Sequence, residues 1–532
     1  MQWSDLIVLG PAGATALGAL GILLLSVLLA PRTPGRRPGA SGARVSRVSG
    51  VSKASRVSGV SKASRASRPS ESGGEDELAR MRVNLLLAGL ATASLALAGG
   101  FAFSRLMSQP APSPLSPMLD LDGLAALSIL VVGLAAVLVT WLSTSRLTAI
   151  RIPYGEYYAL VLLGLAGSFA ALQAENMIVL FLGLELLGMA TTILTAAERG
   201  KKHGLESALK AFLSNALGSA LLLLGIILLF GATGHFDYPG LRDSLDAARW
   251  LDLAGLALVF AGLAMKLALV PFHQWLPDVQ EGTSTSVAAF VSTCVVMTVT
   301  LAWLRLVLHG LPDLHALLSP VFAGLGVASI VLANLMALVQ RNVKRMLGWL
   351  VIAQAGTWML AFCVGDEAAF GAMFFYLVAY ALVMLGAFGV VMTLKGGGRE
   401  LERLEHFAGI AESRKGLAAI MTLFMLALAG VPGTVGFWAR WHLVGALVAG
   451  GELVLAIVAV MGSVVSLYIC MQVPVMMYMR ETLEEEVTES ATNELLVLLL
   501  CAGVVIGLGI WPDPLLPGWG MGLLEFFESS VH

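Results

Sequence analysis

Long apolar runs separated by short polar segments dominate the pattern along the chain. A bilayer core about 30 Å thick is crossed by roughly 20 apolar residues of helix, and fourteen runs approach that length. They lie near residues 6–29, 83–103, 124–142, 157–174, 177–196, 208–230, 251–276, 285–308, 318–338, 346–364, 368–394, 417–447, 453–477 and 495–510. The pattern predicts an all-α, polytopic membrane protein with about fourteen transmembrane helices.

The positions of lysine and arginine test this count, because basic residues gather in the loops on the cytoplasmic side. Loops after odd-numbered runs hold 26 basic residues, whereas loops after even-numbered runs hold 3. If one helix had been missed or added, the basic residues would be spread over both groups of loops. The first run lacks a basic segment before it and a small-residue cleavage site behind it, so we expect a retained helix. Fourteen spans with both termini outside are predicted.

Composition narrows the class of protein further. Of 532 residues, 57% are hydrophobic and 13% are charged, whereas a soluble domain is about 25% charged. A net charge of −2 does not attract nucleic acid. We therefore expect the lipid bilayer, and not nucleic acid, to surround this chain. The four cysteines are too far apart to form a metal or iron–sulfur ligand set: Cys294, Cys363, Cys470 and Cys501. We expect no metal and no cofactor in this chain.

A low-complexity stretch separates the first two predicted helices. The nonapeptide RVSGVSKAS occurs twice in tandem, at Arg47–Ser55 and Arg56–Ser64. Serine, glycine and arginine cannot build a packed core, so residues 31–80 are predicted to be a disordered, basic cytoplasmic insertion. A phosphorylation site or a tether to anionic lipid is the functional alternative, but a solvated linker is favoured.

Four basic residues remain inside the predicted spans, and one acidic residue lies in the middle of a span: Lys210, Lys266, Arg305 and Arg440, with Glu185. A charge at the bilayer centre costs a few kcal/mol, so such residues usually face a polar interior, where they pair or carry ions. Arg305 lies near a helix end, and we expect its side chain to reach the membrane surface. The other four are candidates for function.

Glu185, Lys210 and Lys266 allow two interpretations. They could form static buried ion pairs that fix helix packing. Alternatively, burial favours the neutral lysine while a nearby carboxylate favours the charged one. Movement of the glutamate would then switch the lysine between its charged and neutral forms. The residues favour the second interpretation, a proton relay.

Two prolines interrupt predicted helices beside intramembrane cations. Pro271 follows Lys266, and Pro432 precedes Arg440. Proline removes a backbone donor and breaks a helix, and broken helices in membranes line hydrated cavities. Each break falls in the fourth helix of a five-helix set, which predicts two inverted repeats. His273, two residues past the first break, either passes protons or is a hydrogen-bonded structural group.

These features give a predicted organisation of six parts. They are a first helix (1–30), the insertion (31–80), two helices (81–150), a first five-helix repeat (155–310), a second (313–480), and a last helix with a C-terminal tail (490–532).

From about Leu121 to Tyr478 the chain resembles the antiporter-like subunit N family of bacterial proton-pumping NADH:quinone oxidoreductase (complex I). The matching segments read GEYYALVLLGLAGS, LFLGLELLGM, KLALVPFHQWLPDVQEG, QRNVKRMLGW and LALAGVPGTVGF. The resemblance implies that Glu185, Lys210 and Lys266 are proton-relay groups. It also implies a bacterial inner-membrane location and other membrane and peripheral subunits of a respiratory complex as partners, with flavin, iron–sulfur clusters and quinone in those subunits.

The resemblance also exposes departures. Val296 stands where the family usually has a lysine, Gln354 where it has a histidine, and Arg440 where it has a lysine. An arginine does not readily release a proton, so Arg440 is predicted to act as a fixed-charge gate. A subunit of a sodium/proton antiporter, and a structural subunit of a membrane hydrogenase-like complex, are the alternatives.

Overall fold

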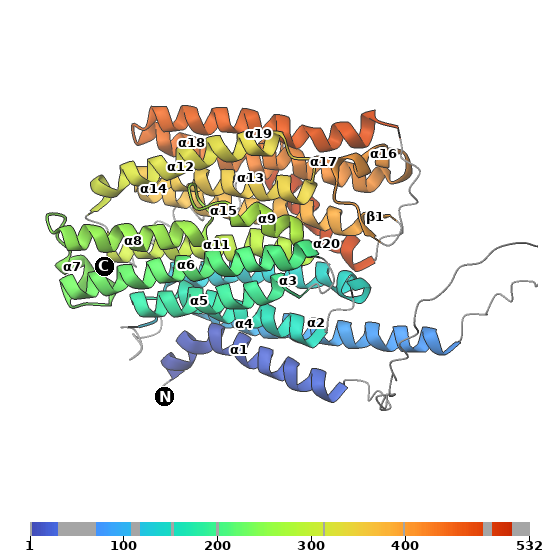
Figure 1. Ribbon diagram of the computed structural model, residues 1–532, viewed down its shortest axis with the longest axis horizontal. Coiled ribbons are helices and arrows are strands. Elements are labelled where there is room, and N and C mark those ends of the chain that lie inside the picture. Colours follow the sequence, from blue (N-terminus) through green and yellow to red (C-terminus); the bar gives the residue numbers. More distant parts are fainter. Residues whose placement is uncertain are drawn as a thin grey trace, which may run out of the picture.

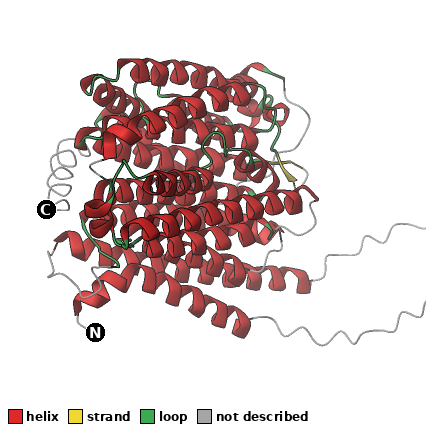
Figure 2. Ribbon diagram, turned by 60° about the vertical axis from the view of Figure 1, so that its left-hand side comes forward, coloured by secondary structure: helices red, strands yellow, loops and turns green. Residues whose placement is uncertain are grey.

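Helices that run side by side along the long direction of the molecule make up almost the whole chain (Figures 1 and 2). The computed structural model describes residues 3–29, 71–107, 118–150, 154–197, 202–311, 314–396, 399–481 and 492–512. Helix α7 lies at one end of this bundle and strand β1 at the other, and we call these the α7 end and the β1 end (Figure 1).

Three helices precede the first repeat. They are α1 (Trp3–Leu29), α2 (Glu71–Met107) and α3 (Gly123–Ile150). Because α2 begins at Glu71, the last part of the predicted insertion is helical and not disordered. The tandem RVSGVSKAS segments lie outside the described residues.

Five predicted spans of the first repeat are present in order. The elements are α4 (Tyr154–Leu172), α5 (Met177–Thr195), α6 (Lys202–Thr233), α7 (Tyr238–Ser244), α8 (Trp250–Lys266), α9 (Trp275–Gly282), α10 (Thr285–Phe290), the π-helical η1 (Val291–Val295) and α11 (Val296–Gly310). Asn176 caps α5 by accepting a hydrogen bond from the Ile178 amide at 2.8 Å, and it bridges to Asp237, which caps α7. Both caps therefore lie at the α7 end.

The second repeat follows the same order of spans. Its elements are α12 (His315–Leu338), α13 (Val343–Met359), α14 (Ala361–Val364), α15 (Glu367–Thr393), β1 (Lys395–Gly396), β2 (Arg399–Glu400), η3 (Leu404–Phe407), α16 (Ile410–Ser413), α17 (Lys415–Ala429), α18 (Val435–Ala449) and α19 (Leu453–Met479), and α20 (Thr492–Ile510) closes the described chain. The two strands form one short antiparallel pair.

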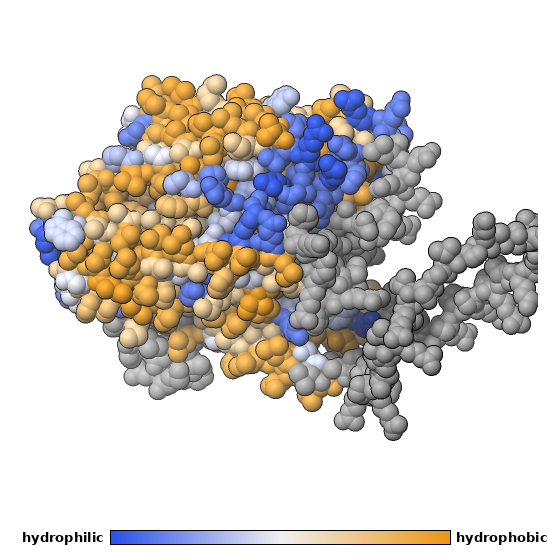
Figure 3. All heavy atoms as spheres, in the orientation of Figure 1, coloured by the Kyte–Doolittle hydropathy of each residue, from blue (hydrophilic) through white to orange (hydrophobic). Residues whose placement is uncertain are grey.

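The predicted fold class and number of spans are confirmed. Within the described residues, twelve helical segments are long and apolar enough to cross a membrane. The other two predicted spans are the interrupted ones, in which α8 precedes α9 and α17 precedes α18. Apolar side chains cover most of the face in Figure 3, and hydrophilic side chains gather toward the β1 end.

Both helix breaks lie where the prolines predicted them. Helix α8 ends at Lys266, and Ala268 then takes a positive φ of 58° before α9 begins at Trp275. Helix α17 ends at Ala429, and Gly430 has a φ of 82°. Such φ values are uncommon for residues other than glycine. Each break thus turns the chain sharply inside a span.

The most deeply buried span is the one from α10 through α11. Every residue of its apolar window, within Thr285–Gly310, is buried inside the molecule. Its neighbours include α4, α15 and α3. This span therefore forms the centre of the bundle, where any charged side chain requires protein partners.

Candidate functional site

A network of four polar side chains surrounds the end of α8. The Nζ atom of Lys266 donates to Asn215 Oδ1 at 2.9 Å and to Ser219 Oγ at 2.9 Å, and it lies 3.5 Å from Glu185 Oε2. Ser219 in turn donates to Glu185. The Lys266 side chain is only 5% exposed, so this lysine is held by protein groups inside the membrane region.

Three helices bring these groups together. Glu185 lies on α5, Asn215 and Ser219 lie one turn apart on α6, and Lys266 is the last residue of α8. Close approach of α5 and α6 depends on Gly188, since a Cβ atom there would lie 2.4 Å from Asn215 Oδ1. A glycine is therefore needed at this point for Asn215 to reach Lys266.

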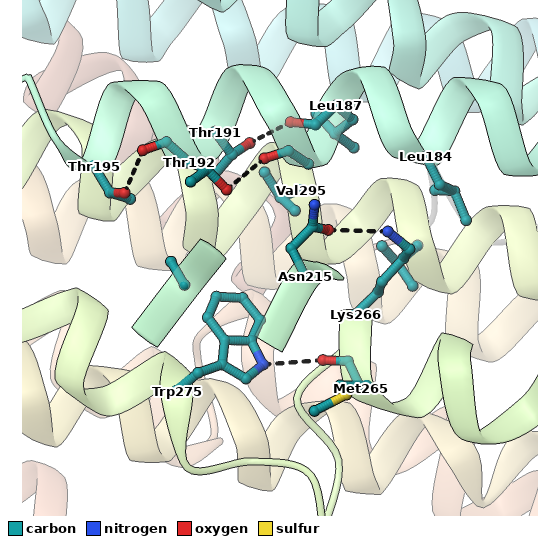
Figure 4. Close-up of a pocket in the computed structure, with 13 residues that line it drawn as sticks. Leu184, Leu187, Thr191, Thr192, Thr195, Asn215, Met265, Lys266, Trp275 and Val295 are labelled. Carbon is teal, nitrogen blue, oxygen red and sulfur yellow. Dashed lines mark hydrogen bonds between the residues drawn. The ribbon is translucent and has the colours of Figure 1, made fainter. Parts of the chain in front are cut away.

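A cavity extends from Lys266 along α5. It has about 480 Å³ of space free of protein atoms, including the open space at its mouth. Thr191, Thr192 and Thr195 line one wall (Figure 4). Each threonine hydroxyl donates to a carbonyl of its own helix, which leaves its oxygen free to accept. Thr195 is the last residue of α5, so the cavity runs from the lysine toward the β1 end.

Trp275 forms part of the opposite wall of this cavity (Figure 4). Its indole Nε1 donates to the Met265 carbonyl at 2.9 Å. That carbonyl lies at the end of α8, where the break removes its usual helical partner. The first residue of α9 therefore satisfies the end of α8 and fixes the width of the cavity beside Lys266.

Lys210 lies apart from this network. Its Nζ donates to Asp278 Oδ2 at 2.6 Å and lies 2.9 Å from Glu206 Oε1, and the side chain is 43% exposed. Asp278 also pairs with Arg345 of α13 at 3.0 Å. The structure thus places Lys210 in an ion-pair group near the β1 end that joins the first repeat to the second.

His273 lies within the first break and faces α13. Its ring centroid is 5.4 Å from that of Trp349, and its Nδ1 atom is buried with no hydrogen-bond partner in the described structure. No hydrogen bond to Lys266 or Glu185 is present among the described contacts. Its role in proton transfer stays a prediction.

Arg440 is held at the second break by neutral groups. Its Nη2 donates to the Leu428 carbonyl at 2.7 Å and its Nη1 donates to Ser463, while the guanidinium carbon lies 5.9 Å from the centroid of the Tyr376 ring. No carboxylate pairs with Arg440 in the described part of the chain. The residue therefore places an uncompensated positive charge beside the break.

Neutral polar groups occupy the space between the two breaks. Tyr376 donates to Gln354 Oε1 at 2.5 Å, and Tyr380 donates to the Ser292 carbonyl at 2.8 Å. Val296, at the start of α11, is buried and apolar. Gln354 and Val296 thus place an amide and an alkyl group at the positions where the sequence comparison expected a histidine and a lysine. Neither group readily exchanges a proton.

The sequence prediction for Arg305 is wrong. The side chain does not reach the membrane surface but is 1% exposed, with Nη1 2.6 Å from Asp122 Oδ1 and Nη2 2.5 Å from Glu175 Oε1. Its helix crosses the centre of the bundle, so the guanidinium meets protein and not lipid headgroups. The one signal in the sequence was the position of Asp122 and Glu175, each of which lies two residues before a predicted span.

Asn215 and Ser219 were also missed from the sequence. They are neutral, and single polar residues are common in membrane helices, so composition does not distinguish them. The one available signal was their spacing of four residues, which places both on one face of a helix. Within the described residues, no group of three or more histidine, cysteine or acidic side chains is arranged to hold a metal ion.

Comparison with known proteins gives a consistent result. Residues 174–466 match the family described as "NADH:quinone oxidoreductase/Mrp antiporter, TM". Curated proteins named NADH-quinone oxidoreductase subunit N are similar to the chain. The protein from Alkalilimnicola ehrlichii is 35% identical over 369 residues, which cover 68% of this chain and 75% of that protein. The protein from Chloroflexus aggregans is 37% identical over 405 residues, 75% of this chain and 83% of that protein.

Solved structures share the fold. A chain of respiratory complex I from Thermus thermophilus with bound Aureothin aligns with a TM-score of 0.70 and 27% identity, covering 84% of this chain and 98% of that chain. A chain of the Mrp complex from Dietzia sp. DQ12-45-1b aligns with a TM-score of 0.76 over 98% of each chain at 18% identity. At this low identity, the comparison with the Mrp complex shows only that the two chains share a fold.

Proposed function

Because the chain belongs to the NADH:quinone oxidoreductase/Mrp antiporter transmembrane family, we propose that it is a membrane-arm subunit of a proton-translocating NADH:quinone oxidoreductase. Relatives that carry the name of subunit N of that enzyme support this proposal. The chain moves protons across the membrane, whereas flavin, iron–sulfur clusters and quinone belong to partner subunits. It is thus an enzyme subunit without a redox centre of its own.

The observation that carries this proposal is the buried Lys266–Ser219–Glu185 arrangement at the end of a broken helix. A lysine enclosed by protein is costly to keep charged unless acceptors surround it. Here its acceptors include a carboxylate, whose distance sets how strongly the charge is favoured. A small movement of α5 relative to α8 would therefore change the protonation state of Lys266.

Ser219 offers a direct route for the proton. The Lys266 ammonium donates to the serine oxygen while the serine hydroxyl donates to Glu185. One N–H bond breaks at Lys266 as an O–H bond forms at Ser219, and the original serine O–H bond breaks as one forms at Glu185. The products are a neutral amine and a neutral carboxylic acid, so the transfer leaves no isolated charge in the membrane.

The threonine-lined cavity supplies a path to Lys266 from the β1 end. Its oxygens can accept hydrogen bonds from water in an otherwise apolar wall. Basic residues gather in the loops at this end, which supports its assignment to the cytoplasmic side. We therefore assign both termini to the outer side of a bacterial inner membrane, with protons entering from the cytoplasm.

We assign residues 155–310 and 313–480 to the two inverted repeats, each with five spans and a break in the fourth. In this assignment the first repeat carries the proton relay. The second carries a fixed charge at Arg440, because a guanidinium retains its proton. Glu185, Lys266 and Arg440 are the proposed functional residues, with Lys210 and His273 as further candidates.

Replacement of Glu185 by glutamine tests the proposal. The amide keeps the shape of the side chain but cannot take up the proton from Ser219, so NADH-driven proton pumping in membrane vesicles should fall by at least about tenfold. Glu156→Gln, at an exposed position of α4, is the matched control. Normal pumping by an assembled Glu185→Gln complex contradicts the proposal.

A sodium/proton antiporter subunit is the second candidate, since the matched family includes Mrp antiporters. The two candidates differ in their partners. Purification of the native assembly through this chain should recover subunits that contain flavin and iron–sulfur clusters. Recovery of membrane subunits alone, with sodium-dependent proton exchange in vesicles, would favour the antiporter.

A further inference from the structure

A second group of ionisable side chains lies at the α7 end of the first repeat, away from the lysine network. Arg305 and His309 lie one turn apart on α11, Asp122 directly precedes α3, and Glu175 precedes α5. The side chains of these four residues are between 1% and 12% exposed. We call them the α7-end cluster.

Arg305 supplies hydrogen bonds to only some of the carboxylate oxygens in this cluster. Its Nη1 binds Asp122 Oδ1 at 2.6 Å and its Nη2 binds Glu175 Oε1 at 2.5 Å. The Ala125 amide also donates to Asp122 Oδ1, at 2.8 Å. Asp122 Oδ2 is buried and has no hydrogen-bond partner in the described structure, although Asp122 as a whole is 7% exposed. A buried carboxylate oxygen without a donor is costly.

His309 faces both carboxylates. Its Nδ1 lies 2.8 Å from Glu175 Oε1, and its Nε2 lies 3.7 Å from Asp122 Oδ2. A neutral imidazole has one N–H donor and one lone pair, so either neutral tautomer directs a lone pair at a carboxylate oxygen. Only the imidazolium offers a donor to each carboxylate. The 3.7 Å distance between Nε2 of His309 and Oδ2 of Asp122 is too short for a water molecule to lie between the two atoms.

We propose that His309 and the two carboxylates form a proton-binding site on the outer side, from which protons that pass Lys266 leave the membrane. The proposal rests on the proposed function for the origin of those protons. Loading breaks an O–H bond of a hydronium ion that arrives from the relay and forms an N–H bond at Nε2 of His309, which gives an imidazolium and a water molecule. Unloading breaks that bond and gives the proton to water at the outer face, which leaves a neutral imidazole.

Helix α11 connects this site to the lysine network. Val295, the last residue of η1, and Val299 of α11 line the cavity beside Lys266, and His309 follows Val299 by ten residues, or about 15 Å of helix. Thr298, one residue before Val299, shares a 2.6 Å hydrogen bond with Ser168 of α4. A hydroxyl pair therefore lies at the relay end of the path along α11.

Other charged and titratable groups near His309 set its surroundings. The Tyr238 hydroxyl, on α7, is buried, and its pKa is raised by burial and by the nearby Glu175 charge. Burial, and then the Asp122 charge, raise the pKa of Asp120. The positive charges of Arg305 and Arg105 act in the opposite direction and lower it, but by less. Burial acts to raise the pKa of Asp122, but the Arg305 and His309 charges outweigh it and hold that pKa below its usual range.

The charges of the cluster therefore leave room for one more proton. Three carboxylates, from Asp120, Asp122 and Glu175, face the guanidinium of Arg305, and Arg105 adds a second positive charge beside Asp120. With neutral His309 the group carries one excess negative charge, and with imidazolium it is neutral. An imidazole is also a side chain that can both gain and lose a proton, which suits it to loading and unloading at this site.

The first test observes the proton directly in the purified full-length chain. Nitrogen NMR of the histidine-labelled protein at one fixed pH should show an imidazolium signal that disappears in His309→Gln. Asp122→Asn should shift that signal toward neutral imidazole, because the asparagine amide can donate to Nε2. Retention of the imidazolium in His309→Gln, or a neutral His309 in the native chain and in Asp122→Asn alike, overturns the proposal.

The second test measures proton pumping by the native complex in vesicles as the pH of the outer side is varied. Native pumping should slow as the outer pH is lowered, because a higher outer proton concentration keeps the site loaded, and His309→Gln should be slower and independent of outer pH. Asp122→Asn should behave in the same way if the glutamine variant does not assemble. His235→Gln, at a partly exposed histidine of the same end, is the matched control.

The outcomes separate this proposal from the proposed function. A native complex that does not pump contradicts the proposed function, while the NMR result still decides whether His309 binds a proton. A native complex that pumps, with His309→Gln lowering the rate equally at every outer pH, assigns the cluster a structural role and overturns the exit site.

Discussion

Lys266 and Ser219 approach to 2.9 Å from two different helices, with the lysine nitrogen as donor and the serine oxygen as acceptor. The same serine donates to Glu185. A hydroxyl that accepts from a cation and donates to an anion is suited to pass a proton between them. The direct distance from Lys266 Nζ to Glu185 Oε2 is 3.5 Å, long for a hydrogen bond, so the serine is the shorter route.

Ser219→Ala should therefore slow proton pumping. The substitution removes the bridging hydroxyl but leaves Asn215 to hold Lys266 at 2.9 Å. We expect a fall of about tenfold in NADH-driven pumping by vesicles that contain equal amounts of assembled complex. Ser214→Ala, on the same helix but outside the network, should pump normally. Equal pumping by the two variants would show that the proton does not pass through Ser219.

Lys210→Gln should have a smaller effect than Lys266→Gln. Lys210 is 43% exposed and pairs with Asp278 and Glu206, and a pair of this kind contributes at most about 1 kcal/mol to stability. We expect Lys210→Gln to retain more than about half of the native pumping, whereas Lys266→Gln loses most of it. Thermal unfolding of the purified chain provides the stability measurement. Equal loss of pumping in both variants would place Lys210 in the relay.

The sequence predicted the elements of the fold because its signals are local. Each apolar run, each break at Pro271 and Pro432, and the contrast in basic residues between alternate loops can be read within a short window. The sequence also indicated that Glu185 has an intramembrane lysine as its partner, Lys210 or Lys266, since isolated charges in a membrane segment have few available partners. These predictions required no knowledge of how the helices pack.

Contacts between distant segments could not be predicted in this way. Arg305 is 183 residues from Asp122 in the sequence, and no local pattern indicates that α3 and α11 place these two side chains together. The same limit applies to Lys210, since its separation from Lys266 depends on where α6 and α8 cross. Helix packing, and not residue type, decides which intramembrane charges meet.

Arg305→Gln should destabilise the protein strongly. The change leaves Asp122 and Glu175 buried without their cationic partner, and removal of one side of a buried ion pair costs about 3–5 kcal/mol. Arg341→Gln is the control, because Arg341 and its partner Glu405 are 78% and 51% exposed and exposed pairs contribute little. Thermal unfolding in detergent should show a large loss for Arg305→Gln and a small one for Arg341→Gln. Similar losses would contradict the buried-pair interpretation.

Gly430→Ala and Gly433→Ala form a matched pair at the second break. Both glycines have positive φ values, of 82° and 91°, and an alanine in that region costs about 1–2 kcal/mol. A Cβ atom at position 430 would also lie 2.6 Å from Arg440 Cδ, whereas at position 433 it meets nothing within 4 Å. We expect both variants to lose stability, but only Gly430→Ala to lose pumping beyond what its lower amount of assembled complex explains.

Arg440 provides the sharpest test of how the second repeat works. Its charge lies beside the break, held by the Leu428 carbonyl and Ser463, with no carboxylate partner among the described residues. If the charge is a fixed gate, Arg440→Lys should keep much of the pumping, because an ammonium preserves the positive charge. Arg440→Ala should lose at least about tenfold, since it removes the charge and leaves the carbonyl at the break without its donor. Pumping in vesicles, normalised to assembled complex, separates the variants. Equal pumping by alanine and arginine at this position would show that the residue is structural and that the second repeat does not gate proton movement.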